Sequence, residues 1–276
     1  MNIDLHCHSN VSDGALAPAA VARRAARNGV EVWALTDHDQ LAGLTEAREA
    51  ALAAGMRFVA GVEVSVTWRG STIHVVGLRI DPENGTLVGG LAKVRGGRLE
   101  RARQMARDLG AAGIDGALEG ALRRAANPAM VSRTHFARFL AEIGAVADTK
   151  DAFRNYLVPG KPGYVAHQWA ALADAVGWIR AAGGEAVLAH PGRYGLSAGA
   201  MDALLREFRE AGGEAIEVVT GSHSPDQYRH FAAVAAQYDF AASRGSDFHG
   251  PQEGAEFGTL PPLDPALRPM WRDWAL

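Results

Sequence analysis

Short apolar segments alternate with alanine-rich segments along most of the chain. Several apolar segments are almost continuously hydrophobic, which is the pattern of strands buried on both faces of a parallel sheet. We expect strands at 3–6, 31–36, 57–64, 72–79, 186–190, 214–219 and 239–244. Regular alternation of about seven strands with helices favours an α/β barrel or an open doubly wound sheet.

Helical patterns fill most of the intervals between these strands. Pro18 suits the first turn of a helix that ends near Gly29, and a second helix is expected from about 41 to Gly55. Further helices are expected near 168–182, 199–211 and 225–237. The proline-rich stretch 258–269 predicts an irregular tail that closes the fold.

The alternation stops between about 96 and 164, where the sequence is helical or irregular and shows no convincing strand. We therefore predict a barrel formed by 1–97 and 164–276, with a helical insertion at 98–163.

Composition narrows the class of protein. The chain is 48% hydrophobic and 21% charged, which is typical of a folded globular protein and excludes disorder. A net charge of −3 gives no overall positive field for binding duplex DNA. The single cysteine, Cys7, fits a reducing compartment, and no signal peptide or membrane-spanning run is visible. We expect a cytoplasmic protein; its oligomeric state is left open.

Histidines and carboxylates gather near the ends of the predicted strands. His6 and His8 stand two residues apart, so both imidazoles point to one face of a strand. Because chemistry in α/β barrels is carried at the carboxyl ends of the strands, we expect the whole set to converge there. The set is His6, His8, Asp13, His38, Glu63, His74, His190, Asp247 and His249.

These residues predict a centre for divalent metal ions. Nine nitrogen and oxygen ligands are too many for one ion and suffice for two or three. Imidazole together with carboxylate suits Mn, Fe or Zn better than Mg or Ca. Taken alone, His74 is also typical of a core histidine, and Cys7, on the opposite face of its strand, is expected to pack in the core.

The motifs that hold these residues resemble those of the PHP (polymerase and histidinol phosphatase) family. They are HCHSNVSDG at 6–14, TDHD at 36–39, GVEVS at 61–65, His74, AHPGR at 189–193 and GSDFH at 245–249. The resemblance implies a distorted seven-stranded β/α barrel with a trinuclear centre. It implies one ion on His6, His8, Glu63 and Asp247, a second on Glu63, His74 and His190, and a third on Asp13, His38 and His249.

The insertion carries VSRTHFARFL at 131–140 and GKPGYV at 160–165, which resemble the stand-alone bacterial branch that acts on nucleotides. The resemblance implies a manganese-dependent phosphatase, with Fe or Zn as other fitting metals. It would remove the 3′-phosphate of nucleoside 3′,5′-bisphosphates, leaving a nucleoside 5′-monophosphate, and would also trim short RNA from the 5′ end.

Three alternatives stay open. One is a phosphatase of the histidinol phosphate type, and another is a metal- or RNA-binding module without catalysis. The third, an amidohydrolase-like enzyme, would need a lysine on a strand to bridge two metals. Only Lys93, Lys150 and Lys161 are present, and none lies on a predicted strand.

A multinuclear centre clamps the attacking and leaving oxygens of an in-line displacement, so we expect phosphoester hydrolysis. Asp13, Asp247 and His249 are expected also to contact the substrate phosphate or to transfer protons. His223, in the loop after the sixth strand, is a candidate general acid, although a solvated loop histidine is an equal alternative.

The insertion predicts a second phosphate site. Ser132 is a suitable N-cap for a helix that opens with Arg133, Thr134 and His135, and free N–H groups at such a helix start bind anions. Arg98, Arg101, Arg103 and Gln104 in the preceding helix are expected to close on the same anion, or else to form a solvated basic face. Two phosphate sites are what a bisphosphorylated nucleotide requires.

Overall fold

The computed structural model describes residues 1–275, so only residue 276 of the predicted 164–276 segment lies outside it. Its strands form one seven-stranded sheet in chain order, which confirms the predicted number of strands. The strands are β1 (Ile3–Asp4), β2 (Val32–Leu35), β3 (Arg57–Trp68), β4 (Ser71–Leu78), β5 (Glu185–Leu188), β6 (Ala215–Thr220) and β7 (Ala241–Gly245).

The continuous hydrophobic runs predicted a parallel sheet, and this prediction is wrong for one strand. β4 pairs antiparallel with both β3 and β5, whereas the other neighbouring strands pair in parallel. The cause is a two-residue turn in which Arg69 and Gly70 have φ values of 45° and 81°. Positive φ at both central residues is the geometry that joins two strands in a tight hairpin. The beginning of β4 therefore lies at the rim where the parallel strands end.

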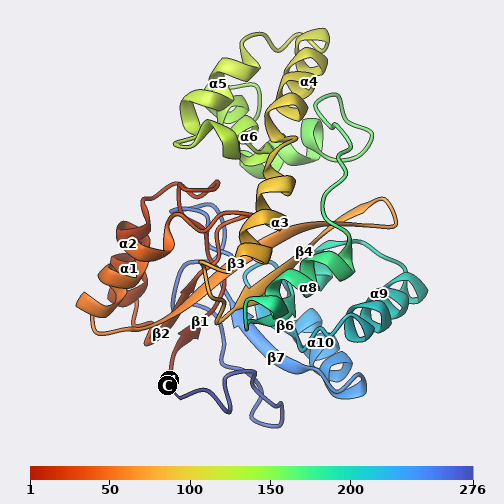
Figure 1. Cartoon of the computed structure of the whole chain (residues 1–276). Coiled ribbons are helices and arrows are strands. Elements are labelled where there is room, and N and C mark those ends of the chain that lie inside the picture. The colour runs from red at the N-terminus through yellow and green to blue at the C-terminus, as the bar shows by residue number, and fades with distance from the viewer. Residues whose placement is uncertain (276) are drawn as a thin grey trace.

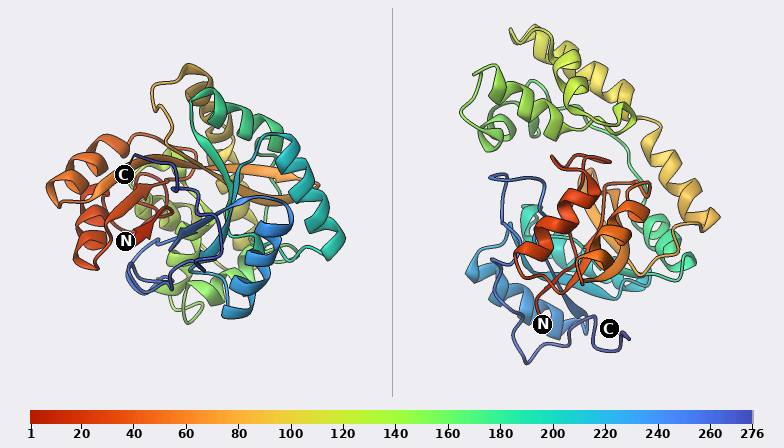
Figure 2. Two further views of the ribbon diagram at one scale, coloured as in Figure 1. Left: turned by 90° about the horizontal axis from the view of Figure 1, so that it is seen from below. Right: turned by 90° about the vertical axis from the view of Figure 1, so that its left-hand side faces the viewer.

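The barrel is nearly closed by backbone contacts between its first and last strands. The amide of Leu5 donates to the carbonyl of Arg244 at 3.0 Å, and that of Asp247 donates to His6 at 2.8 Å. A third bond runs from the His8 amide to the Phe248 carbonyl at 2.9 Å. The two ends of the sheet consequently lie side by side at the centre of the molecule (Figure 2).

Helices surround the barrel (Figure 1). They are α1 (Pro18–Arg27), α2 (Leu44–Ala53), α3 (Gly85–Arg95), α8 (Leu172–Ala181), α9 (Ala198–Glu210) and α10 (Pro225–Gln237), and a 3₁₀ turn spans Pro191–Arg193. Alternation along β2 shows how the two hydrophobic layers form: Trp33 and Leu35 belong to the cluster packed against the helices, while Val32 and Ala34 belong to a second cluster. Met270 of the irregular C-terminal tail joins the second cluster.

Helix α3 was missed by the sequence analysis because its sequence, GTLVGGLAKVR, holds three glycines. The side chain of Asn84 caps its start by accepting from the amides of Thr86 and Leu87. Gly90 packs directly on Trp178, where an added Cβ would lie 2.3 Å from the indole ring. The glycine is thus needed for the close approach of α3 to α8.

The insertion stands over the carboxyl rim of the barrel (Figures 1 and 2). Its helices are α4 (Arg98–Ala111), α5 (Ala117–Arg124), α6 (Arg133–Glu142) and α7 (Thr149–Ala152), with a 3₁₀ turn at Pro128–Met130 and a π-helical turn at Phe153–Leu157. They share a hydrophobic cluster of their own around Leu109, Phe136 and Leu157. This separate core supports a division of the chain into a barrel and an insertion at 98–163, and these domain boundaries stay a prediction. Within residues 1–275, no helix is both long and apolar enough to cross a membrane.

Candidate metal centre and adjoining cleft

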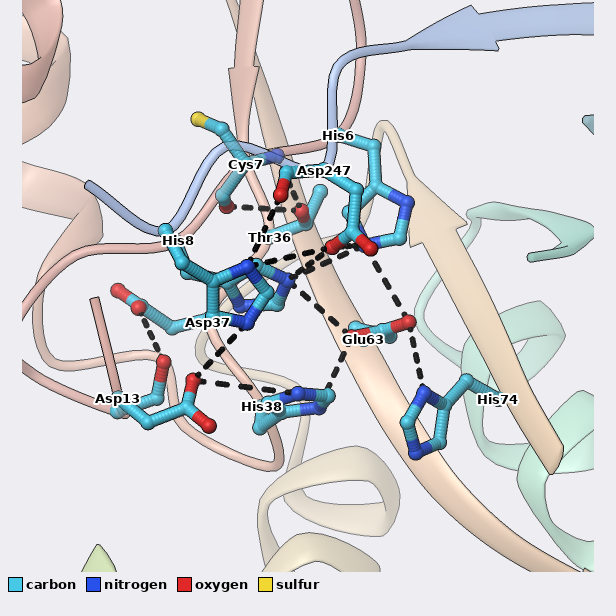
Figure 3. A network of polar contacts seen from close by, with 12 residues as sticks. His6, Cys7, His8, Asp13, Thr36, Asp37, His38, Glu63, His74 and Asp247 are labelled. Atoms are coloured by element: carbon cyan, nitrogen blue, oxygen red, sulfur yellow. Dashed lines mark hydrogen bonds and ion pairs between the residues drawn. The ribbon is translucent and has the colours of Figure 1, made fainter. Parts of the chain in front are cut away.

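The structure brings the nine predicted ligands together at one rim of the barrel, around the carboxylate of Glu63 (Figure 3). Its Oε1 lies 3.1 Å from Nδ1 of His74 and 3.0 Å from Nε2 of His190. Its Oε2 lies 2.9 Å from Nδ1 of His38. The imidazoles of His6 and His8 complete the ring around Glu63, each at 3.3 Å.

The antiparallel hairpin places His74 beside Glu63. In the register of β3 and β4, Glu63 lies opposite Val76, and His74 lies opposite Ser65. Glu63 and His74 are therefore diagonal neighbours on one face of the sheet, within reach of long side chains. His74 therefore lies among the candidate metal ligands, and it is the start of its strand, not the end, that brings it there.

Two ligands occupy strained backbone positions. His190 has φ of 28° and Asp247 has φ of 56°, both in the left-handed region that non-glycine residues rarely adopt. Such positions cost roughly 1–3 kcal/mol each and persist where the surrounding structure enforces them. Both residues stand two positions beyond the ends of their strands, where the chain turns at the rim.

Buried atoms without hydrogen-bond partners indicate that the centre is built for cations. In residues 1–275, ten buried side-chain nitrogens or oxygens lack a partner, and seven of these belong to predicted ligands. The seven residues are His8, Asp13, His38, Glu63, His74, His190 and Asp247. Buried polar atoms are normally satisfied, so this concentration is what a site for metal ions requires.

Four overlapping groups of ligands have their donor atoms within 4.8 Å of one another. They are His8–Asp13–His38–His249, His6–His190–Asp247, His6–His8–Glu63 and His38–Glu63–His74. Because the groups share members, they fit two or three ions, and how the ions divide the ligands stays a prediction. The set of imidazoles and carboxylates suits divalent transition metals.

The imidazoles keep the carboxylates ionised and ready to bind cations. Burial alone would raise the pKa of Glu63, but His38, His74 and His6 together hold it well below its usual value. His38 and His249 likewise hold the pKa of Asp13 well below its usual value, against the effect of burial. A metal ion would therefore meet anionic oxygen ligands at neutral pH.

A cleft between the metal centre and the insertion is lined by several guanidinium groups. Arg101 of α4 and Arg133 of α6 enter it from the insertion, and Arg193 enters from the turn after His190. Arg193 forms an ion pair of 2.7 Å with Asp247 Oδ2. Thr134 lines the cleft as well. The cleft therefore has a face of metal ligands and a face of cationic side chains.

Three residues that we expected to contact substrate point elsewhere. Arg103 is 51% exposed and pairs with Glu100, and Gln104 donates to Asp108 at 2.6 Å. His135 is buried within the cap of its own helix, where its Nδ1 accepts from the amide of Ser132 at 3.0 Å. Helical periodicity distinguishes Arg101 from Arg103, because residues two apart in a helix face different directions.

His223 is placed as a structural residue and not as a general acid. Its Nε2 accepts from the amide of Gly192 at 3.0 Å, and its Nδ1 lies 3.1 Å from the carbonyl of Val218. The ring stacks on Phe231 with centroids 4.8 Å apart. With both nitrogens bonded to backbone, His223 has no proton to give to a leaving oxygen, and it instead fixes the turn after His190.

The sequence analysis missed Arg193 and Glu217. Glu217 is buried in β6, where it accepts from the amide of His190 at 2.6 Å and lies 2.7 Å from Nδ1 of His6. Glu217 could have been found from the sequence, because it is a single carboxylate within the apolar strand AIEVV, just as Glu63 is within β3. Arg193 lies within the AHPGR motif, but its role depends on the cleft above it.

Comparisons with known proteins agree with this geometry. Residues 4–158 match the family model of the PHP domain. The chain is 55% identical over 273 residues to the 3′,5′-nucleoside bisphosphate phosphatase of Chromobacterium violaceum, covering 99% of this chain and 96% of that relative. It is 42% identical over 273 residues to the 5′-3′ exoribonuclease Rnm of Escherichia coli, covering 98% and 93%. The solved structure of an amidohydrolase from Chromobacterium violaceum, with bound sulfate and no metal, matches with a TM-score of 0.96 at 54% identity, over 99% of this chain and 95% of that one.

Proposed function

This chain belongs to the PHP family and is a metal-dependent phosphoesterase, and we propose that it removes the 3′-phosphate of nucleoside 3′,5′-bisphosphates. The products would be a nucleoside 5′-monophosphate and phosphate. The named activity of the relative from Chromobacterium violaceum supports the substrate class. The orientation of the substrate is our inference from the two faces of the cleft.

The observation that carries the proposal is a pair of half-buried arginines, Arg101 and Arg133, that face the metal centre. Burial and the neighbouring arginines lower the pKa of Arg101 to about 9, and burial lowers the pKa of Arg133. Arg101 donates a hydrogen bond to the backbone carbonyl of Val165 at 3.0 Å, and Arg133 donates one to that of Leu157 at 3.3 Å. Among residues 1–275, neither forms an ion pair with a carboxylate. Two half-buried cations that lack an ion pair with a carboxylate call for an anionic ligand.

The two faces of the cleft then bind two phosphates of one substrate. The nine ligands would hold divalent ions, which neutralise phosphoryl oxygens and supply a water of lowered pKa. Arg101 and Arg133 would bind the 5′-phosphate and so place the 3′-phosphate at the metal face. Arg193, beside Asp247, is positioned to share the charge of the 3′-phosphoryl group. A substrate with one phosphate, such as histidinol phosphate, leaves the arginine face without an anion.

The test uses Mn²⁺-loaded protein with adenosine 3′,5′-bisphosphate and, in parallel, histidinol phosphate. We expect AMP and phosphate from the bisphosphate, and little turnover of histidinol phosphate. If adenosine 3′-phosphate accumulates instead of AMP, the orientation is reversed. Turnover of histidinol phosphate alone would contradict the proposal.

A variant of Arg133 tests the second phosphate site directly. Loss of a charged hydrogen bond to phosphate costs roughly 1.5–3 kcal/mol, so Arg133→Ala should raise KM for the bisphosphate about 10- to 100-fold. Adenosine 3′-monophosphate lacks the 5′-phosphate, and its KM should not change. Arg103→Ala, which removes an exposed arginine of the same insertion, is the matched control. Equal effects of Arg133→Ala on both substrates would contradict a 5′-phosphate site.

A second cavity favours trimming of short RNA as a further activity. It has a volume of about 450 Å³ and shares Thr134, Arg193 and His249 with the cleft. Phe153 also lines both, whereas the cation Lys150 lines only the second cavity. A cavity of this size is within the range of small-molecule sites, and an aromatic ring with a cation suits a nucleotide.

We propose that this cavity holds the nucleotide on the 3′ side of the scissile phosphate. The activity of the Escherichia coli relative supports this use. A 5′-phosphorylated dinucleotide should be hydrolysed, and Phe153→Ala should lower kcat/KM for it more than for the bisphosphate. Equal reductions for both substrates would exclude a nucleotide subsite at Phe153.

The finer expectations about metal, compartment and assembly stay proposals. We propose Mn²⁺ as the working metal because the mixed imidazole and carboxylate ligands fit it, with Fe and Zn as alternatives. Measuring turnover after reconstitution with each metal tests this. A cytoplasmic location is supported by the free, buried thiol of Cys7, and the net charge of −3 supports small substrates over duplex DNA.

A further inference from the structure

The two carboxylate oxygens of Asp13 face different parts of the molecule. Oδ2 accepts hydrogen bonds from the Ser132 hydroxyl at 3.0 Å and from the Thr134 hydroxyl at 2.9 Å, both at the start of α6. Oδ1 is buried and has no hydrogen-bond partner among residues 1–275. It lies 3.5 Å from Nε2 of His249 and 3.9 Å from Nε2 of His38. One oxygen is therefore held by the insertion and the other is turned toward the metal ligands.

Helix α6 makes a second contact with the same group of ligands. Arg138, about one turn beyond Thr134 along the helix, donates from Nε to Glu253 Oε1 at 2.8 Å. Its Nη2 reaches the backbone carbonyl of His249 at 3.4 Å. The guanidinium of Arg138 is 13% exposed, so these contacts are shielded from water. The insertion thus touches the loops of Asp13 and His249 through one rigid helix.

His6 and His190 are positioned from within the barrel. Glu217 of β6 holds the ring of His6 and the backbone of His190, with no contribution from α6. The His6–His190–Asp247 group and the His8–Asp13–His38–His249 group therefore have different supports. A substitution in α6 can therefore alter Asp13 and His249 without altering the contacts of Glu217 with His6 and His190.

We infer that α6 is a clamp that positions Asp13 and His249, so that the ion on the His8–Asp13–His38–His249 group is bound tightly only while the insertion is docked on the barrel. Ser132 and Thr134 act as positioning residues through Asp13. The inference rests on the metal centre and not on the identity of the substrate. Residues that orient metal ligands typically contribute 10- to 100-fold to metal affinity.

The experiment measures binding of Mn²⁺ alone, by equilibrium dialysis of the metal-free protein against graded concentrations. In Thr134→Val, the shape of the side chain is kept and its hydrogen bond to Asp13 is lost. We expect the dissociation constant of one bound Mn²⁺ ion to rise at least about 10-fold. The dissociation constants of the remaining ions should not change. Ser132→Ala combined with Thr134→Val should weaken binding of the same ion further.

Two further variants separate positioning from general loss of structure. Thr134→Ser retains the hydroxyl and should restore the wild-type binding curve. Asp148→Ala removes the N-cap of α7 in the same insertion, without a contact to any metal ligand, and should also bind Mn²⁺ as the wild type does. Because Ser132 still caps α6 in Thr134→Val, that single variant decides the question even if the double variant unfolds.

Three results would overturn the inference. In the first, Thr134→Val binds Mn²⁺ with the wild-type curve. In the second, all equivalents weaken together in Thr134→Val. In the third, the wild-type protein binds no Mn²⁺, which removes the premise itself. A failure of the proposed substrate assignment would leave all these binding curves unchanged, so the two failures are distinguishable.

Discussion

Arg98, the first residue of α4, forms an ion pair with Asp39, which lies just after β2, and the two side chains are only 5% and 0% exposed. Asp39 also accepts from the amide of Ser65 at 2.7 Å and from its hydroxyl at 2.8 Å. The guanidinium carbon of Arg98 lies 4.7 Å from the ring centre of Trp169. This ion pair joins the insertion to the barrel beside the cleft.

Replacing Arg98 by Ala should destabilise the protein strongly. Removing one partner of a buried ion pair leaves the other charge uncompensated, which costs about 3–5 kcal/mol. We expect a loss of this size in the free energy of unfolding, measured with urea. Arg103→Ala, whose partner Glu100 is exposed, should change stability by less than about 1 kcal/mol. Similar losses in the free energy of unfolding for both variants would contradict a stabilising role of the buried Arg98–Asp39 pair.

Glu217→Gln should weaken metal binding at the side of the centre that α6 does not support. The variant removes the negative charge beside Nδ1 of His6, and such partners contribute about 10- to 100-fold to metal affinity. Titration of the metal-free protein with Mn²⁺ measures the effect. Glu217→Gln and Thr134→Val should weaken different equivalents. If they weaken the same one, the two supports are not separate.

The stability of the insertion should depend on the protonation of His135. Burial lowers the pKa of its ring to about 4, whereas an unfolded histidine titrates near 6.5. Between these values the unfolded chain binds the extra proton, so stability is lost as the pH falls from about 6.5 toward 4.

Gln at position 135 offers an uncharged acceptor for the same cap. From pH 7 to pH 5, the wild type should therefore lose about 2 kcal/mol more than His135→Gln, as measured by urea unfolding at each pH. Parallel losses in the two proteins would mean that His135 is protonated in the folded state.

Chelation should lower the melting temperature. At a free concentration 100 times its dissociation constant, a bound ion adds about 2.7 kcal/mol, which corresponds to roughly 5–10 °C for a chain of this size. Differential scanning calorimetry with and without EDTA measures the shift, and restoring Mn²⁺ should reverse it. A melting temperature that does not depend on metal concentration would contradict a centre that binds only in the folded state.

The metal centre was predictable because most of its ligands stand in short local motifs near strand ends. The strand pattern alone places His6, His8 and His190 at one rim, wherever the rest of the chain lies. The strand pattern alone does not predict the position of His74, because that position depends on the hairpin at Arg69 and Gly70. The signal was present: apolar and polar residues continue to alternate from Val62 to Trp68, past the predicted end of that strand.

The substrate face was predicted less completely, since it depends on how the insertion is docked. Local sequence identified the helix start at Ser132, but not that its hydroxyl reaches Asp13 across 119 positions in the sequence. Arg101 and Arg103 look alike in the sequence, and only the docking of α4 makes one of them face the cleft. Contacts between distant segments, such as the Arg98–Asp39 pair, set this orientation.

The seam between β1 and β7 fixes when the metal centre can be completed during synthesis. His6 and His8 are synthesised long before Asp247 and His249, because most of this sequence lies between the two pairs. Until β7 pairs with it, β1 presents an open strand edge, and the ligand set lacks two members. The complete set of nine ligands can therefore assemble only after β7 has been synthesised, and a chain that stops before β7 lacks Asp247 and His249.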